Sequence, residues 1–213
     1  ATTVSFTVAG PSITKSGTIT AFTACVGTAT AAQTFTVSAS GLTASSTVNL
    51  ATPAGFEIAT TSGGTYSSSI SLAENAGTVT NTTIYLRLSA SAATGTYSGS
   101  ISLTSSGATT QTITIPASTV NALPTITGTA TTVIGGTSTL SSTIAGGTWS
   151  SSTTAVATIT SLGVVTGVAN GTTTITYTTS SGCATTVSFT VGGPSITKSG
   201  TISAFATCAT TAS

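Results

Sequence analysis

The sequence predicts an all-β chain built from antiparallel β-sandwiches with Greek-key connections. Apolar residues recur at every second position over many short stretches, which is the spacing of a half-buried strand. Turn signals rich in Gly and Ser separate these stretches, and helical periodicity is missing throughout. Thr, whose branched Cβ suits a pleated strand, supplies 57 of the 213 residues. Together these observations favour many short, tightly connected strands.

A first group of strands falls between residues 11 and 120. The predicted strands are 17–23, 34–40, 46–51, 56–60, 68–72, 82–89, 96–104 and 109–116. Alternation is clearest at Ile84, Leu86 and Leu88, which predicts one buried face. Tyr97 lies two residues from a Gly on each side, and we expect it to form a tyrosine corner that closes the Greek key.

A second group of shorter strands falls between residues 124 and 192. These strands are centred on Leu140, Trp149, Val156–Ile159, Val164–Val165, Ile175–Tyr177 and Val187–Val191. The stretch 171–191 predicts a hairpin that turns at 180–183, and we expect Trp149 to be a core residue. Two immunoglobulin-like sandwiches in tandem, module A at 11–120 and module B at 124–192, account for this spacing.

A long internal repeat sets the organisation of the chain. Residues 1–25 recur at 184–208 with 21 of 25 positions identical, at an offset of 183 residues. The rare residues align as well, so low complexity does not account for the match. We therefore expect 1–9 to be the last strand of a preceding module and 194–213 to begin the next module A, within a longer array.

Charge is nearly absent, which excludes some classes of function. The ionisable side chains other than Tyr and Cys are three cationic residues and two Glu, with a net charge of +1. Nucleic-acid binding needs clustered Lys and Arg, so we expect none. No apolar run is long enough to predict a membrane span. A surface with so little charge favours association with other copies of the chain.

Catalysis and metal binding lack their usual residues. His and Asp do not occur, so no Ser has the base that a nucleophile requires and no cluster provides zinc or calcium ligands. Glu57 and Glu74 could in principle be the two carboxylates of a glycosidase. Nothing in their sequence surroundings distinguishes them from solvated surface groups, which is what we expect them to be. The sequence thus predicts a protein that is not an enzyme and binds no cofactor.

Three cysteines suggest disulfides rather than a metal site. Cys25 and Cys208 are equivalent in the repeat, so each period has two cysteines. Two pairings are open: Cys25–Cys183, and Cys183–Cys208. The first is favoured because the turn after the first strand of module A and the last hairpin turn of module B belong at facing poles. The second would require the chain to span module B and fold back.

Three residues are candidate glycan contacts. Arg87 and Tyr85 fall on the strand face opposite Ile84 and Leu86, where a guanidinium and a ring can meet a sugar. Trp149 is the sole Trp and a candidate stacking platform. For Arg87 the competing interpretation is a surface residue that pairs with Glu57.

Module B resembles the bacterial immunoglobulin-like domain of group 2. The residues that carry the resemblance are Trp149–Ser152, Val156–Ile159, Gly163–Gly167 and Gly171–Tyr177. Related modules often have a Cys near the position of Ile134, so Ile134 is a departure from that pattern.

Module A resembles the other repeat unit of giant surface proteins in Bacteroidetes, which include the gliding-motility adhesins. The stretches concerned are Phe35–Ser38, Pro53–Ile58, Ile84–Leu88 and Gly95–Gly99. This resemblance implies an extracellular adhesive or filament-forming role and export by the type 9 secretion route.

The function that follows is a structural repeat segment of a secreted fibre or adhesin stalk, at the cell surface or beyond it. Expected partners are neighbouring repeats, other copies of the chain and surface polysaccharide. Two alternatives stay open. One is an array of polysaccharide-binding modules, which predicts exposed aromatic platforms. The other is a filament whose chains share strands, for which residues 1–9 would serve.

Overall fold

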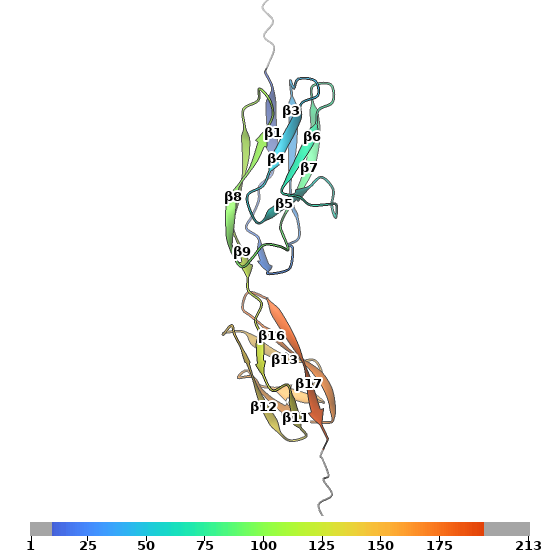
Figure 1. Ribbon diagram of the computed structural model, residues 1–213, viewed down its shortest axis with the longest axis vertical. Helices are drawn as coiled ribbons and strands as arrows, with labels where there is room; N and C mark the ends of the chain where they lie inside the picture. The colour runs from blue at the N-terminus through green and yellow to red at the C-terminus, as the bar shows by residue number, and fades with distance from the viewer. Residues whose placement is uncertain (1–9, 194–213) are drawn as a thin grey trace, which may run out of the picture. The chain divides into compact units, whose positions relative to one another are not determined.

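The computed structural model describes residues 10–193, which form strands β1 to β17 (Figure 1). The chain divides into two compact units. Within the described residues, the first unit holds 10–125 and 178–185, and the second holds 126–177 and 186–193. Both units are sandwiches of two sheets, and each is described by itself below.

The first unit packs a four-stranded sheet, in the order β1-β3-β7-β5, against a five-stranded sheet, in the order β2-β9-β8-β4-β6. The strands are β1 (Ser12–Ser16), β2 (Thr23–Cys25), β3 (Gln33–Ser40), β4 (Thr47–Ala51), β5 (Phe56–Ala59), β6 (Ser69–Ala73), β7 (Val79–Leu88), β8 (Gly95–Thr104) and β9 (Gln111–Asn121). Figure 1 shows β8 and β9 on the opposite side of the unit from β7. Most of the predicted strands are confirmed to within a few residues.

The predicted strand at 17–23 is wrong, because the chain changes sheets there. β1 pairs antiparallel with β3, whereas β2 pairs in parallel with β9. The crossing begins at Gly17, whose φ of 118° suits glycine and whose added Cβ would lie 3.0 Å from Phe35. Ile19 and Phe22 are buried in the crossing, so their apolar character reflects the core and not strand pairing.

β9 runs five residues beyond the predicted end at Pro116. Pro116 is exposed and lies in a bulge, where the register with β8 shifts between Tyr97 and Gly99. A bulge tolerates proline because no ladder hydrogen bond is required from its nitrogen. The bulge also changes which positions are buried, from Ile115 before it to Ser118 after it.

The core of the first unit consists of the alternating apolar residues that the sequence predicts. The largest fully buried side chains of this unit are Phe35, Leu50, Ile58, Ile84, Leu86, Leu88, Ile101, Leu103 and Ile115. They project from both sheets into one contiguous cluster. Burial of this apolar surface is the main stabilising contribution to the unit.

Tyr97 forms the predicted corner. Its hydroxyl donates to the backbone oxygen of Ala93, four residues upstream, at 2.9 Å. Its ring lies against Gly55, where an added Cβ would come within 2.4 Å of the ring. The contact therefore ties the start of β8 to the loop before β5.

Tyr97→Phe is expected to lower the free energy of unfolding of the first unit by about 1 kcal/mol, because one intramolecular hydrogen bond is lost while the ring remains. Hydrogen exchange of the first-unit amides in the two proteins gives the difference. The matched control is Tyr85→Phe, since the Tyr85 hydroxyl has no hydrogen-bond partner among residues 10–193. Equal effects of the two substitutions would contradict the assignment of the corner.

The second unit has a four-stranded sheet in the order β10-β12-β15-β14 and another in the order β11-β17-β16-β13. Its strands are β10 (Ile126–Gly128), β11 (Thr131–Val133), β12 (Thr137–Ser142), β13 (Thr148–Ser151), β14 (Ala157–Ile159), β15 (Val164–Gly167), β16 (Gly171–Thr178) and β17 (Ala184–Gly192). This strand order is that of an immunoglobulin-like sandwich whose first strand is divided between the sheets. The predicted fold class is confirmed.

The sequence did not predict β10 and β11. β10 has the sequence Ile-Thr-Gly and β11 has Thr-Thr-Val. Strands of three residues are too short for alternation to be visible in the sequence. Gly128 at the end of β10 has a φ of 116°. The chain changes sheets after it, because β10 pairs with β12 in one sheet and β11 pairs with β17 in the other. The first unit makes the same change of sheets between β1 and β2.

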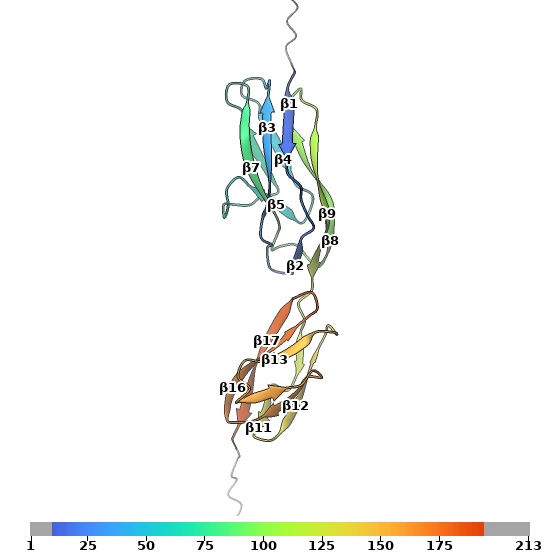
Figure 2. The same ribbon diagram turned by 180° about the vertical axis from the view of Figure 1, so that it is seen from behind.

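The predicted hairpin at 171–191 is confirmed, and it can be followed in Figure 2. β16 and β17 are joined by a turn in which Thr179 N donates to Cys183 O at 2.9 Å and Gly182 N to Thr179 O at 3.0 Å. Gly182 has a φ of 86°, which is why glycine is suited to this position.

The core of the second unit is small. Its buried members are Leu140, Ala157, Val165, Ile175, Phe189 and Val191. Trp149 is partly buried against this cluster, and its ring centroid is 4.6 Å from that of Tyr177. Tyr177 in turn donates its hydroxyl to Ile144 O at 2.6 Å and accepts from Gly147 N at 2.8 Å. Trp149 is thus a core-packing residue, as the sequence predicts.

Candidate functional site

The described part of the chain holds one disulfide, between Cys25 and Cys183. Cys25 ends β2, and Cys183 ends the turn between β16 and β17. Their Cα atoms are 5.6 Å apart across a sequence separation of 158 residues. Of the two pairings that the sequence leaves open, the structure has this one; Cys208, which the other requires, lies outside the described residues.

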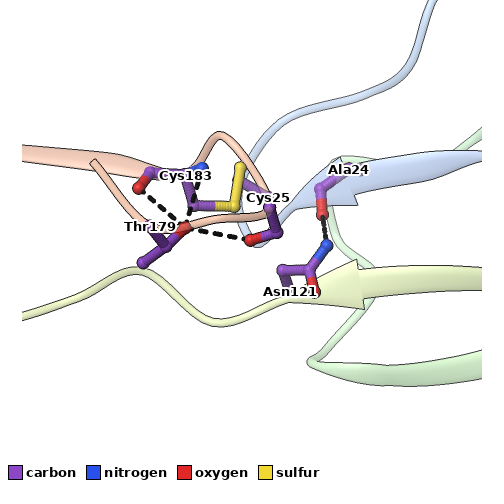
Figure 3. The surroundings of a disulfide bond; sticks show 6 residues. Ala24, Cys25, Asn121, Thr179 and Cys183 are labelled. Atoms are coloured by element: carbon purple, nitrogen blue, oxygen red, sulfur yellow. Dashed lines mark hydrogen bonds between the residues drawn. A yellow bond between two sulfur atoms is a disulfide. The ribbon is translucent and has the colours of Figure 1, made fainter. Parts of the chain in front are cut away.

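Cys25 is held by the edge of the five-stranded sheet. β2 pairs in parallel with the end of β9, with Cys25 opposite Asn121. Asn121 accepts from Val26 N at 2.9 Å, and its side-chain nitrogen donates to Ala24 O at 3.4 Å (Figure 3). β9 makes these contacts in its last residues, beyond the bulge at Pro116.

Cys183 is held by a single Thr in its own turn. The Thr179 hydroxyl accepts from Cys183 N at 3.1 Å and donates to Cys183 O at 3.1 Å (Figure 3). Both residues are buried, and Cys183 has 0% of its surface exposed. A soluble thiol cannot reach the Cys183 sulfur in such a position without local opening, whereas Cys25 is only half-buried.

The turn that carries Cys183 belongs to the first unit, although most of β16 and most of β17 belong to the second. The backbone therefore crosses the boundary between the units at 125–126, 177–178 and 185–186. The disulfide fastens this turn to β2 covalently. Ile134, which stands where related modules are expected to have a Cys, is 45% exposed.

Glu57 and Arg87 form an ion pair on adjacent strands of the first unit. They are opposite each other in β5 and β7, and Arg87 Nε lies 2.7 Å from Glu57 Oε1. The guanidinium carbon is 3.7 Å from the centroid of the Tyr66 ring, which is a cation–π contact. The side chains are only 32% and 18% exposed, so Arg87 is not a freely extended surface cation.

The predicted pairing of Arg87 with Glu57 is confirmed, whereas the expectation that Glu57 and Glu74 are only solvated groups is wrong. Glu57 holds Arg87, as above. Glu74 accepts from the backbone nitrogens of Ser45 at 2.8 Å and Gly77 at 2.6 Å, and so ties together two turns. Ser45 has a φ of 65°, a conformation that this contact helps to hold. Each carboxylate therefore has a separate structural role.

A hollow lies beside Glu57 in the first unit. Its lining includes Glu57, Tyr97 and hydroxyls of Ser68, Ser89 and Ser91. The Tyr97 hydroxyl is engaged by Ala93 O, and the Ser89 and Ser91 hydroxyls bond each other at 2.9 Å. Within 10–193, moreover, no group of acidic, Cys or His side chains has the arrangement of a metal site. Several of the polar groups that line the hollow are thus bonded within the protein.

The three candidate glycan contacts lie in different surroundings. Arg87 and Tyr85 are half-buried neighbours on β7 of the first unit. Trp149 belongs to β13 of the second unit, where Tyr177 covers one side of its ring. Glycan binding by these residues stays a prediction. In the part of the chain described, no helix has the length and apolarity needed to cross a bilayer.

No family model and no curated protein sequence matches the chain. Among solved structures, it is similar to a C-terminal 282-residue fragment of intimin, solved with the intimin-binding domain of the translocated intimin receptor. The two share 19% identity with a TM-score of 0.43, over 84% of this chain and 63% of that one.

Two other solved structures are similar at lower scores. Invasin, described as a bacterial integrin-binding protein, shares 16% identity with a TM-score of 0.38, over 85% of this chain and 38% of that one. The two immunoglobulin domains of DIP-gamma share 14% identity with a TM-score of 0.35, over 87% of this chain and 98% of that one. The chain thus spans less than two thirds of the intimin fragment and of invasin. The strand order of the two units remains the basis of the fold assignment.

Proposed function

We propose that the chain is a structural repeat segment of a secreted extracellular fibre or adhesin stalk, which provides reach and surface attachment. The observation that carries the proposal is the recurrence of residues 1–25 at 184–208. In its described parts, the repeated segment supplies β1 and β2 to one sandwich and β17 to the other. A segment that contributes to two folded units is expected to recur only if the pair of units recurs with it.

The boundaries of the repeating modules are part of the proposal. Module A takes 11–120 and module B takes 124–192. Residues 1–9 are the last strand of a preceding module B, and 194–213 begin the next module A; both stretches lie outside the described residues. β17, whose sequence 1–9 nearly repeats, is an inner strand between β11 and β16. A strand in that position belongs to a complete sandwich, which supports these boundaries.

An extracellular location is supported by the disulfide and by the near absence of charge. Disulfides persist in oxidising surroundings, and a fully buried Cys183 suits a permanent structural bond. From the sequence resemblance of module A, we further propose that the protein comes from the Bacteroidetes, is related to the gliding-motility adhesins and is exported by type 9 secretion. A non-enzymatic role is supported by the structural engagement of both Glu side chains.

The experiment is surface labelling of intact cells that express the protein, with antibodies raised against the folded chain. We expect label on cells that have not been permeabilised, distributed along filaments that leave the surface, and loss of label after brief external protease treatment. Label that appears only after permeabilisation would contradict the proposal.

The surroundings of Arg87, namely Glu57 and the Tyr66 ring, favour polysaccharide binding as a second candidate. The Arg87 guanidinium, the Tyr66 ring and the hydroxyl-lined hollow beside Glu57 lie close together in the first unit. On a glycan array, binding by the chain should fall at least tenfold in Arg87→Gln and stay unchanged in Lys15→Gln, an exposed cation on β1. Equal binding by both variants and the parent would remove this candidate.

A further inference from the structure

The disulfide creates two covalent routes between the ends of the described chain. From residue 10, the backbone runs through β1 and β2 to Cys25. From there it continues either through all of residues 26–182 or directly across the disulfide to Cys183, β17 and residue 193. Of two routes between the same points, the shorter becomes taut first and carries the tension.

The two routes differ greatly in length. The direct route contains 27 residues, 10–25 and 183–193, and reaches at most about 100 Å when fully extended. The backbone route is longer by the 158-residue separation of the two cysteines, which corresponds to about 520–570 Å of extended chain. The direct route therefore fixes how far the folded chain can be pulled.

The direct route has little slack before it becomes taut. Most of it already lies in strands, namely the 5 residues of β1, the 3 of β2 and the 9 of β17. Strand residues rise about 3.3 Å each, close to full extension. The main irregular stretch is 17–22, and there the buried Ile19 and Phe22 and the hydrogen bond from Thr20 N to Gln33 Oε1 at 2.8 Å hold the chain in place.

We propose that the Cys25–Cys183 disulfide is a strain limiter: it routes tension through β1, β2 and β17 and keeps the residues between the cysteines out of the load path. Those residues include both hydrophobic cores apart from a few members on β1, the crossing and β17. Under pull, the bypassed strands cannot be drawn out. The surfaces that they form stay folded and presented.

In a fibre the device would recur in every period, and this extension rests on the proposed function. Cys208 has the repeat position of Cys25, so the load would pass from Cys183 through about 25 residues to the next disulfide. Each period would then reach no further than about 90 Å, whereas a period without the disulfide could be drawn out roughly sevenfold further. A stalk of this kind transmits force without lengthening.

The test is single-molecule pulling on the whole chain, held at its two ends, in a Cys208→Ser background that prevents disulfide exchange. Compared with this parent, a variant that also has Cys25→Ser and Cys183→Ser should reach a contour length about 520–570 Å greater. The oxidised parent, when treated with a thiol reductant under load, should gain the same contour length. Equal contour lengths of parent and variant would overturn the proposal.

A matched control separates the covalent limit from ordinary stability. Leu140→Ala weakens the core of the second unit, and Leu140 lies between the two cysteines. With the disulfide intact, Leu140→Ala should leave the contour length unchanged. A large gain in contour length by the oxidised Leu140→Ala protein would also overturn the strain limiter. Because the test uses one isolated chain, its failure would leave the proposed fibre role standing, and failure of surface labelling would leave the limiter standing.

Discussion

Phe189→Ala is expected to lower the free energy of unfolding of the second unit by about 3–5 kcal/mol, the usual cost of removing a fully buried Phe. Phe189 has 0% of its surface exposed and is the largest of six buried side chains in that core. A small domain has a total stability of only about 5–15 kcal/mol, so the loss is a large fraction of it. Urea unfolding followed by the fluorescence of Trp149, the one Trp in the chain, reports on this unit.

The matched control is Phe6→Ala, which changes the equivalent residue of the other repeat copy. If residues 1–9 belong to a preceding module, as proposed, Phe6 contributes nothing to either unit of this chain. The Phe6→Ala protein should therefore unfold at the same urea concentration as the parent. A loss similar to that of Phe189→Ala would show that the boundaries of the repeating modules have been set wrongly.

Removal of the disulfide by Cys25→Ser with Cys183→Ser is expected to lower the free energy of unfolding by about 2–4 kcal/mol. The cross-link closes a loop with a separation of 158 residues, for which the chain-entropy model gives an upper limit of about 5 kcal/mol. Part of that limit is lost because the unfolded chain keeps residual structure. Urea unfolding monitored by circular dichroism, with and without reductant, measures the effect.

Three comparisons make this prediction specific. The reduced parent should unfold like the double variant, and reductant should not change the double variant. Cys208→Ser alone should leave the unfolding midpoint unchanged, because Cys183 is already bonded to Cys25. If Cys208→Ser instead produced the loss, the disulfide of the protein in solution would be Cys183–Cys208.

The strands with several alternating apolar residues could be predicted from sequence, because burial of one face leaves a period of two. β7, with Ile84, Leu86 and Leu88 buried, is the clearest case. The crossing between β1 and β2 could not, since Ile19 and Phe22 are buried there without a strand partner. The close contact that requires Gly at position 17 is with Phe35, on a strand that is distant in sequence, so it could not be predicted either.

The candidate site was predictable in its residues more than in its contacts. The repeat identified which cysteines are equivalent, and the facing poles expected of the two modules favoured Cys25–Cys183, the pairing that the structure has. The contacts around the disulfide depend on which sheet edge and which turn come together in space. β9 continues past a bulge, which the sequence marks only with Pro116, to Asn121 opposite Cys25. The contacts of Glu74 with Ser45 and Gly77 depend on the geometry of two turns, which alternation does not reveal.

The central claim is that this chain is one step of a tandem array of β-sandwich modules. Chains with one, two, three and four copies of the 183-residue period test it directly when their lengths are measured by electron microscopy. The account predicts that length increases by a constant amount for each added period, and that no increment exceeds the roughly 90 Å allowed by the covalent path through the disulfides. Particles whose length stays the same as periods are added, or whose increments change from one period to the next, would contradict it.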